Sequence, residues 1–322
     1  MSTPRIRWGV LGTASIAVRK VIPGLQAAGN GVVTAIASRQ LANAERTATA
    51  CGIPLALGSY QALLDHPDID AIYIPLPNHL HVDWSILALE AGKHVLCEKP
   101  IGLNAAEGRR LLAAAKARPH LKVAEAFMYR CHPRWDLVRT LVNEGAIGEL
   151  RSVHTTFSYD NHDPANIRNI AAMGGGAWLD IGCYGVSVAR WLFVDEPISV
   201  RGVRDIDPAF NTDRQTTAVL QFAGGSAMVL CATQLAPHQS VSIHGTTGRL
   251  ELAMPFNPPS DVPTTIHAIR GSDVEEIAVP PCDQFTIQAE RFNDAVLNDG
   301  PVPVSIEDAV ANMIVLDRLS VM

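Results

Sequence analysis

Short runs of β-branched and aliphatic residues alternate with amphipathic stretches over the first 125 residues. The runs predict buried strands and the amphipathic stretches predict the helices that connect them, because a parallel sheet is covered on both faces by crossover helices. We expect strands at residues 6–11, 32–37, 71–76, 94–97 and 121–124. We expect helices at residues 15–28, 41–51, 79–91 and 104–118.

The pattern changes after Phe127, where a polar and an apolar position alternate with a period of two. Strands joined by short connections predict a mostly antiparallel sheet. Expected strands lie at 150–159, 197–206, 214–222, 226–234, 239–245 and 264–269, and expected helices at 134–143, 182–193, 285–298 and 307–319. The Pro-rich stretch 255–263 predicts a loop.

The length of 322 residues predicts two domains, which we place at residues 1–126 and 127–322. The carboxyl-terminal helix can still pack back on the first domain. The hydrophobic content of 48% and the charged content of 18% are typical of a globular protein.

The formal net charge of −6 and the absence of a Lys/Arg-rich run argue against nucleic acid and anionic membranes as partners. The sequence contains no run of 18 apolar residues, and its first residues predict no secretory signal. We therefore expect a cytoplasmic protein. Six scattered cysteines without a C-x-x-C pair predict free thiols.

A dinucleotide-binding turn is predicted directly after the first strand, where Gly12-Thr13-Ala14-Ser15-Ile16-Ala17 reads G-x-A-x-x-A. Gly12 permits the tight turn, and Ala14 is small enough to let backbone approach a pyrophosphate at a helix amino end. The fingerprint lacks its central glycine, and an ordinary strand-to-helix turn is the alternative.

The residues after the second strand indicate which dinucleotide binds. NAD enzymes usually carry an acid there, whereas this chain has Ser38 and Arg39 and no acid before Glu45. A guanidinium forms forked hydrogen bonds to phosphate, so NADP is favoured over NAD. The alternative is that Arg39 is a solvated residue at the start of the next helix.

Lys99 lies in Cys97-Glu98-Lys99-Pro100, at the carboxyl end of an expected buried strand. Open α/β sheets bind ligands at that edge, so Lys99 is a candidate site residue. A solvated surface lysine is the alternative.

The chain resembles the Gfo/Idh/MocA oxidoreductases, the family of glucose-fructose oxidoreductase and inositol dehydrogenase. The resemblance rests on the 12–17 turn, on Ile74-Pro-Leu-Pro-Asn-His79, on Ala91-Gly-Lys-His-Val-Leu-Cys-Glu-Lys-Pro100, on Gly174-Gly-Gly-Ala-Trp-Leu-Asp-Ile-Gly-Cys-Tyr184 and on Pro303-Val-Ser-Ile-Glu-Asp-Ala309. Glu125-Ala-Phe-Met-Tyr-Arg130, His132-Pro133 and Tyr184 resemble the branch of dimeric dihydrodiol dehydrogenase, NADP-dependent xylose dehydrogenase and glucose-fructose oxidoreductase. The resemblance to this family implies an α/β fold with an amino-terminal Rossmann domain. It also implies a second α+β domain built on a large open sheet, which is often used to form dimers.

The resemblance places the catalytic lysine, aspartate and tyrosine of this branch at Lys99, Asp180 and Tyr184. Asp180 and Tyr184 are spaced i, i+4 and would share one face of a helix. A phenol titrates near 10 and needs a nearby ammonium to lower its pKa. We expect Tyr184 to transfer the proton, Lys99 to tune it and Asp180 to orient the substrate or the lysine, although the roles of Lys99 and Tyr184 could be exchanged.

Further candidates follow the expected strands. We expect Pro77, Asn78, His79, Glu98 and Lys99 near the cofactor. The substrate candidates are Tyr129, Arg130, Asn161, His162, Arg168, Asp180 and Tyr184. Tyr129 and Arg130 could instead bridge the domains together with His132, and the pair His79-x-His81 lacks the further ligands that a metal site needs.

The sequence thus predicts an NADP-dependent oxidoreductase acting on CH–OH groups, with an aldose or related polyhydroxy compound as substrate. A trans-dihydrodiol dehydrogenase and a sugar transhydrogenase with tightly bound NADP are alternatives, and a non-catalytic NADP sensor is the rival from another class. We expect a homodimer, because one face of the second sheet needs to be covered.

Overall fold

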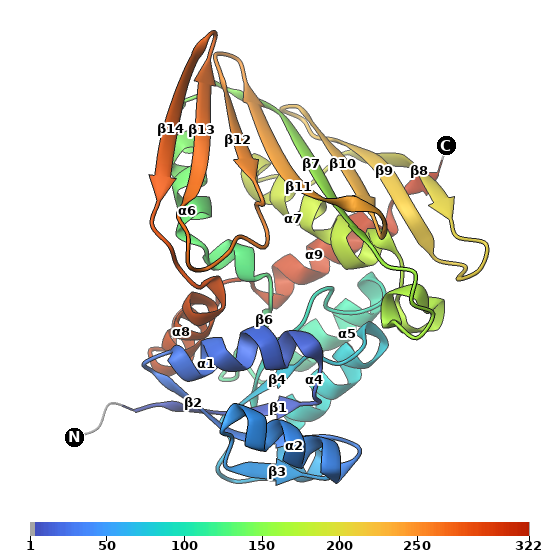
Figure 1. The fold of residues 1–322 in the computed structure, drawn as a ribbon, viewed down its shortest axis with the longest axis vertical. Coiled ribbons are helices and arrows are strands. Elements are labelled where there is room, and N and C mark those ends of the chain that lie inside the picture. Colours follow the sequence, from blue (N-terminus) through green and yellow to red (C-terminus); the bar gives the residue numbers. More distant parts are fainter. Residues whose placement is uncertain (1–3, 322) are drawn as a thin grey trace. The chain divides into compact units, whose positions relative to one another are not determined.

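The computed structural model describes residues 4–321, and its contacts divide them into two compact units (Figure 1). The first unit joins the segment up to Cys131 with Asp283–Val310, and the second joins His132–Cys282 with the segment from Ala311 onward. The expected boundary at 126/127 places 283–310 in the second domain, whereas the structure places this segment in the first unit.

The first unit contains a six-stranded parallel sheet in the order β3-β2-β1-β4-β5-β6. The strands are β1 (Ile6–Leu11), β2 (Gly31–Ala37), β3 (Leu55–Leu57), β4 (Ala71–Ile74), β5 (His94–Cys97) and β6 (Val123–Glu125). Strand order reverses on the two sides of β1, which makes the sheet doubly wound and puts a ligand crevice at the carboxyl end of β1. The expected Rossmann fold is confirmed.

Helices connect or follow these strands. They are η1 and α1 (Ala17–Val21 and Ile22–Ala27), α2 (Leu41–Cys51), α3 (Tyr60–Leu64), η2 and α4 (Asn78–Leu80 and His81–Glu90), α5 (Ala105–Lys116) and η3 (Met128–Cys131). β3 and α3 were not predicted, because runs of three and five residues are too short to show a period. Pro23, near the start of α1, and the cap Asn104 of α5 mark helix starts as the sequence rules expect.

Helix α8 (Gln284–Leu297) belongs to the first unit because it packs against α1 and β1. The Nε1–H of Trp8 donates to Asn293 Oδ1 at 2.9 Å in a buried position, and the rings of Trp8 and Phe292 lie 5.2 Å apart. No pattern local to 127–322 reveals a contact across 285 residues of sequence.

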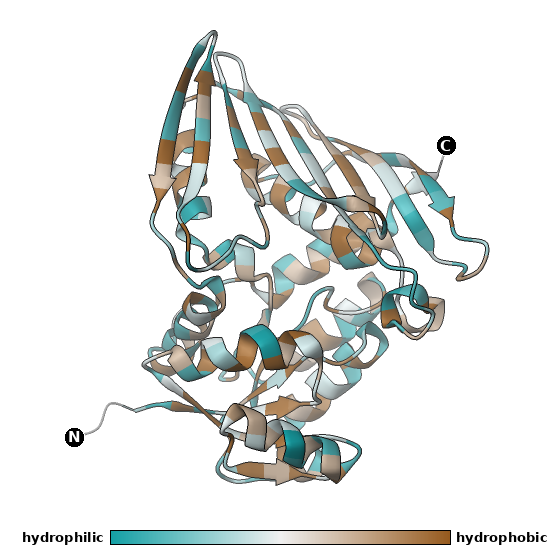
Figure 2. Cartoon of the chain, viewed as in Figure 1, coloured by the Kyte–Doolittle hydropathy of each residue, from teal (hydrophilic) through white to brown (hydrophobic). Residues whose placement is uncertain are grey.

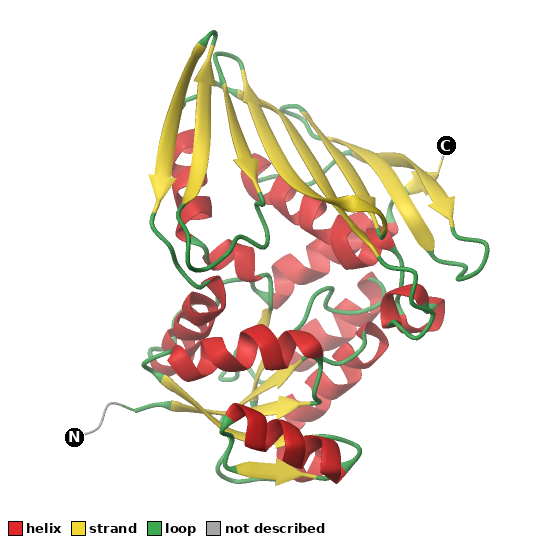
Figure 3. Cartoon of the chain, in the orientation of Figure 1, coloured by secondary structure: helices red, strands yellow, loops and turns green. Residues whose placement is uncertain are grey.

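The second unit is built on a nine-stranded, mostly antiparallel sheet in the order β14-β13-β12-β11-β7-β10-β9-β8-β15 (Figure 3). The strands are β7 (Leu150–Asp160), β8 (Ser199–Ile206), β9 (Asp213–Gln221), β10 (Ser226–Ala232), β11 (Gln234–Gly245), β12 (Arg249–Ala253), β13 (Thr264–Arg270), β14 (Asp273–Val279) and β15 (Ser320–Val321). Among the described strands of this sheet, only the β7–β10 and β8–β15 pairs are parallel. The expected antiparallel sheet is confirmed.

One face of this sheet is covered by α6 (Pro133–Asn143) and α7 (Cys183–Phe193). Along β7, Val153 and Phe157 are buried, whereas His154 between them is half-buried. The strands show the same alternation of hydrophobic and hydrophilic positions in Figure 2. The opposite face of the described strands therefore lacks such cover, and Val219 and Met228 on it are exposed.

The remaining helical segments are η4 (Ile167–Asn169), η5 (Ala171–Met173), η6 (Trp178–Gly182) and α9 (Ile306–Asp317). Between residues 4 and 321, no helix combines the length and the apolar character needed to cross a membrane.

Candidate functional site

The turn after β1 has the geometry that the fingerprint predicts. Gly12 adopts a φ of +98°, a region that favours glycine, and a Cβ there would lie 3.2 Å from a methyl of Leu76. The Gly12 N–H donates to Ala37 O at 2.7 Å, which ties the turn to the end of β2. Residues 15–27 are helical and include a π-turn at Ala17–Val21. Backbone can therefore approach a ligand at Gly12.

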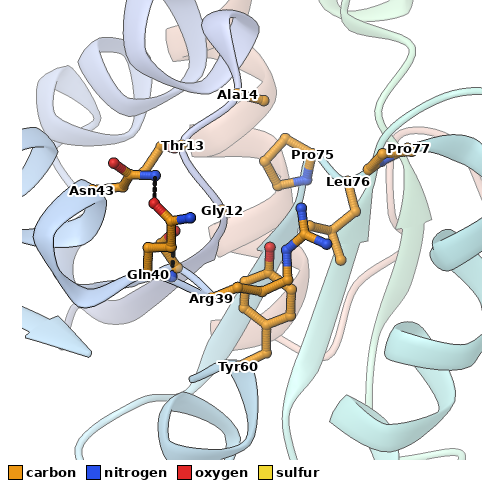
Figure 4. A pocket seen from close by; sticks show the side chains of 11 residues that line it. Gly12, Thr13, Ala14, Arg39, Gln40, Asn43, Tyr60, Pro75, Leu76 and Pro77 are labelled. Atoms are coloured by element: carbon orange, nitrogen blue, oxygen red, sulfur yellow. Dashed lines mark hydrogen bonds between the residues drawn. The ribbon is translucent and has the colours of Figure 1, made fainter. Parts of the chain in front are cut away.

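A cavity of about 630 Å³ opens at this turn (Figure 4). Its volume lies within the range of small-molecule sites. Of the residues predicted to bind the cofactor, Gly12, Thr13, Ala14, Ser38, Arg39 and Pro77 line it. Gln40, Asn43, Tyr60, Pro75 and Leu76 line it as well, and sequence reasoning missed them.

Arg39 is exposed and lies beside Tyr60 at the cavity (Figure 4). Burial raises the pKa of Tyr60, while the charge of Arg39 acts in the opposite direction. Among the described residues that line the cavity, none is Asp or Glu. The donors therefore fit an anionic group such as a phosphate better than a pair of ribose hydroxyls.

The carboxyl ends of β4 and β5 are joined through His81, which is fully buried. Its Nδ1 lies 2.8 Å from Pro100 O and its Nε2 lies 2.7 Å from Leu76 O. Leu76 lines the cavity, and Pro100 follows Lys99 through a cis peptide bond. His81 thus lies between the two loops, with a ring nitrogen within hydrogen-bond distance of a carbonyl oxygen in each.

Lys99 and Glu98 are half-buried at the end of β5. The hydroxyl of Tyr73 donates to Glu98 Oε1 at 2.6 Å, and the Lys99 N–H donates to Glu98 Oε2 at 3.3 Å. Glu98 thereby holds the backbone that carries Lys99.

The other predicted cofactor residues lie beyond the lining of this cavity. Ser15 and Ile16 are exposed at the start of the helical stretch. Asn78 and His79 form the short helix η2 after Pro77. His79 Nδ1 is shielded from solvent and has no hydrogen-bond partner in the described part of the chain, as expected of an atom that contacts a ligand.

In the second unit, the glycine-rich segment leads into a π-turn, η6 (Trp178–Gly182). Gly176 has a φ of +110°, and a Cβ there would lie 2.1 Å from Asp213 Oδ1. Asp213 Oδ2 accepts the Trp178 N–H at 2.8 Å and the Thr216 hydroxyl at 2.6 Å. Burial raises the pKa of Asp213. Asp213 therefore fixes the start of the turn that carries Asp180.

Asp180 is the acceptor of a partly buried polar cluster. Its Oδ2 accepts the Tyr159 hydroxyl at 2.6 Å and the Arg168 Nε–H at 2.9 Å. Asp180 raises the pKa of Arg168, and burial together with Asp180 raises the pKa of Tyr159. Both partners stabilise an ionised Asp180. Tyr159 was not predicted as a site residue, and its position at the end of a strand was the available signal.

Tyr184 lies on α7 and is 4% exposed. Its ring lies 5.5 Å from that of Phe157 and 4.9 Å from that of Phe256. Arg168 lies within electrostatic range of both Asp180 and Tyr184. Asp180 itself lies in the π-turn, so the pair does not share one regular α-helix as its spacing predicts.

Other predicted substrate residues have different surroundings. Tyr129 is fully buried with its ring edge-on to Phe127, and Arg130 lies 3.6 Å from a carboxylate oxygen of Asp308. His162 is exposed and lies 3.0 Å from Asp160. Asn161 accepts the N–H of Asp163 in an exposed turn. Of the predicted substrate residues, Arg168 is thus the one whose side chain hydrogen-bonds to Asp180.

Both ring nitrogens of His81 face carbonyl oxygens, so the His79-x-His81 pair does not present two free ligands on one side. Within residues 4–321, no group of three or more His, Cys, Asp or Glu side chains is arranged to hold a metal ion.

Comparison with known families gives two matches. The oxidoreductase family with an NAD-binding Rossmann fold matches residues 6–126. The GFO/IDH/MocA C-terminal domain matches residues 135–251.

Similar proteins match nearly the whole chain. An uncharacterised oxidoreductase of Rhizobium meliloti is 45% identical over 320 residues, which is 98% of this chain and 96% of the relative. An NADP⁺-dependent D-xylose 1-dehydrogenase of Haloferax volcanii is 37% identical over 97% of this chain and 95% of the relative. The crystal structure of a 3-ketoreductase from Actinomadura kijaniata, in complex with NADP and TDP-benzene, has a TM-score of 0.92 at 34% identity and covers 99% of both chains.

Proposed function

Because the chain belongs to the Gfo/Idh/MocA oxidoreductase family, we propose that it is an NADP-dependent dehydrogenase or reductase of an aldose or a related polyhydroxy compound. The family acts on CH–OH groups with nicotinamide cofactors, and its members similar to this chain include sugar dehydrogenases and ketoreductases. The resemblance that the sequence motifs predict is confirmed.

The observation that carries the choice of NADP is the composition of the cavity at the end of β1. Arg39 and Ser38 line it, and no acid among the described residues does. A 2′-phosphate would accept hydrogen bonds from a guanidinium and a hydroxyl, whereas a carboxylate there would repel it. The left-handed backbone of Gly12 leaves room for a pyrophosphate at the start of the helix.

The residues of this chain would manage the proton. Bound NADP⁺ supplies the acceptor for the hydride that leaves the substrate carbon. We assign the transfer of the hydroxyl proton to the Tyr184 phenol oxygen and the role of a cation that favours phenolate to Lys99. Asp180 would accept a hydrogen bond from the substrate, held in place by Tyr159 and Arg168.

Steady-state NADP⁺ reduction with a panel of aldoses and polyols tests this proposal. General acid–base groups contribute roughly 10²–10⁴-fold, so Tyr184→Phe and Lys99→Met should each lose at least about 10²-fold in kcat. Lys116→Met removes a charge from an exposed lysine and should change nothing. Normal NADP binding with unaltered turnover in both variants would refute the catalytic assignment.

The pH profile separates the two possible assignments of the proton-transfer group. If Tyr184 transfers the proton, Lys99→Arg should retain part of the activity because it retains the charge, and Tyr184→Phe should abolish the limb in which kcat rises with pH as the general base deprotonates. If Lys99 transfers it, Tyr184→Phe should keep that limb, whereas Lys99→Arg should not.

The aromatic contacts of Tyr184 favour a second candidate substrate. Phe157 and Phe256 stack with their rings 5.3 Å apart and both contact Tyr184. A cyclic trans-dihydrodiol is flatter and more apolar than a sugar and would suit such surroundings. Turnover of trans-dihydrodiols but of no sugar would select this candidate over the aldose.

Two further outcomes are informative. Stoichiometric reduction of retained NADP by one sugar, followed by reoxidation by another, would indicate transhydrogenation. Tight NADP binding without turnover of any sugar or diol would indicate a sensor.

We also propose a homodimer through the open face of the nine-stranded sheet, because exposed Val203, Val219 and Met228 lie on its strands β8, β9 and β10.

A further inference from the structure

Cys282 and His132 form a hydrogen-bonded pair that the proposed reaction does not use. The sulfur of Cys282 lies 3.4 Å from Nε2 of His132, and Cys282 is partly exposed. Both residues belong to the second unit, where they are the first and last residues of the segment His132–Cys282. A thiol beside an imidazole is a recurring arrangement of reactive cysteines.

The other nitrogen of His132 determines the direction of this hydrogen bond. His132 is the cap of α6, and its Nδ1 accepts the Arg134 N–H at 3.1 Å. Burial and the charge of Arg134 lower the pKa of His132 to about 4, so the ring is neutral at pH 7. A neutral ring whose Nδ1 accepts must carry its proton on Nε2. His132 therefore donates to the sulfur of Cys282, which favours the thiolate over the thiol.

Arg134 adds a positive charge that forms no salt bridge within residues 4–321. Its side chain is 1% exposed, and its Nη1 and Nη2 donate to the neutral carbonyls of Ala253 and Met254 at 3.1 and 2.8 Å. Its Nε is buried and has no hydrogen-bond partner among residues 4–321. Burial lowers the pKa of Arg134 to about 10, and a negative charge on Cys282 acts against that shift. An anion at Cys282 would thus stabilise a guanidinium that is costly to bury unpaired.

We propose that Cys282 is a reactive thiolate and the chain's principal site of modification by electrophiles and peroxides. With hydrogen peroxide, the thiolate sulfur attacks one oxygen, an S–O bond forms and the O–O bond breaks. The sulfur is oxidised by two electrons to the sulfenic acid, and the departing hydroxide takes a proton and leaves as water. Two nearby acids disfavour the thiolate by charge repulsion. Asp136 lies near His132, and Asp283 is the next residue after Cys282 in the chain.

The remaining cysteines provide internal controls. Cys97, Cys131, Cys183 and Cys231 are buried, and burial raises the pKa of Cys97 and of Cys231. Cys51 is partly exposed like Cys282, but burial raises the pKa of its thiol. Cys51 is therefore a suitable control: its accessibility is similar to that of Cys282, and burial, with no contribution from a described cation, shifts the pKa of its thiol.

The test is the rate of alkylation of each cysteine in the native, full-length protein. The protein is labelled with limiting iodoacetamide between pH 5.5 and 8.5, denatured into excess heavy isotope reagent, and analysed by peptide mass spectrometry. Lowering a thiol pKa by one unit gives up to about tenfold more thiolate at a pH below both pKa values, so Cys282 should react up to about tenfold faster than Cys51 at pH 6.5. Equal rates, or faster labelling of Cys51, would overturn the proposal.

A variant separates the thiolate argument from simple exposure. His132→Asn keeps an oxygen that can cap α6 but removes the N–H that faces the sulfur, so labelling of Cys282 should slow about threefold or more while that of Cys51 is unchanged. Unchanged labelling of Cys282 in this variant would refute the role of His132. Dimedone trapping after peroxide treatment of the wild-type protein should modify Cys282 first, and its absence from that peptide would refute the oxidation step. None of these readouts depends on enzymatic turnover.

Discussion

Replacing His81 with phenylalanine removes the polar link between the ends of β4 and β5 while keeping a ring in the site. At pH 7 the ring of His81 is neutral, because burial lowers its pKa to about 4 even though the carbonyls of Pro100 and Leu76 favour the protonated form. A neutral imidazole donates one hydrogen bond, so the substitution leaves one buried carbonyl without its donor. The expected cost is about 1–3 kcal/mol of unfolding free energy at pH 7.

Lowering the pH should narrow this difference. The pKa of the His81 ring is 6.5 in the unfolded state and about 4 in the folded state. Between these two pH values the unfolded state binds more protons than the folded state. The wild-type protein therefore loses stability as the pH falls from 6.5 toward 4. From pH 7 to pH 5 the shift corresponds to a loss of about 1.8 kcal/mol, taking about 1.36 kcal/mol per pKa unit. The phenyl ring of the His81→Phe variant binds no proton, so the variant escapes this loss.

Urea unfolding of both proteins at pH 7, 6 and 5, followed by tryptophan fluorescence, measures the effect. His120→Phe makes the same chemical change at an exposed position and should stay within about 0.5 kcal/mol of the wild type. A gap between wild type and His81→Phe that widens toward pH 5 would show that the ring is a buried imidazolium that donates to both carbonyls. A negligible gap at pH 7 would show that His81 does not join the two loops energetically.

Three other changes test the site and the assembly. Arg39→Ala should weaken NADP binding by roughly 10–150-fold, the equivalent of about 1.5–3 kcal/mol for a charge-assisted contact, and leave NAD binding unchanged in calorimetry, whereas Arg46→Ala on the exposed side of α2 should change neither. Gly176→Ala should cost at least about 1–3 kcal/mol in unfolding free energy and reduce kcat, because its Cβ would meet Asp213 and its φ is +110°, while Gly224→Ala, with no described atom within 4 Å of its Cβ, should be silent. Val219→Glu places a charge on the exposed sheet face and should shift sedimentation from dimer to monomer at micromolar concentration; a monomeric wild-type protein would refute the proposed interface.

The regular elements were predictable where the chain has a strong period. β1, β5 and α2 have the predicted bounds, because the apolar runs of the two strands are short and bounded and because Gly52 ends the amphipathic helix α2. β14 was missed because its seven residues, Asp273–Val279, are almost all exposed and include two glutamates, so they show no buried face. It forms through pairing with β13, which no local pattern encodes.

The candidate site was predictable at the strand ends and less so elsewhere. The turn at Gly12 and the residues Ser38 and Arg39 follow directly from strand assignments, and the structure places them around one cavity. Tyr60 was not predicted, since it reaches the cavity from a five-residue helix that the pattern does not reveal. Tyr159 was not predicted to contact Asp180, because a strand end and a turn 21 residues apart have no spacing rule that joins them.

The same backbone device recurs in both units. In each, a glycine in the left-handed region, at φ +98° for Gly12 and +110° for Gly176, precedes a π-turn at Ala17–Val21 or Trp178–Gly182. A π-turn inserts a residue into the helix and is frequent at functional sites, because it redirects the side chains before it relative to those after it. In the second unit this redirection falls between Asp180 and Tyr184, so the α-helical i, i+4 rule does not describe their relation. Arg168, which donates to Asp180 and lies within electrostatic range of Tyr184, is then near two side chains that a regular helix would have placed on one face.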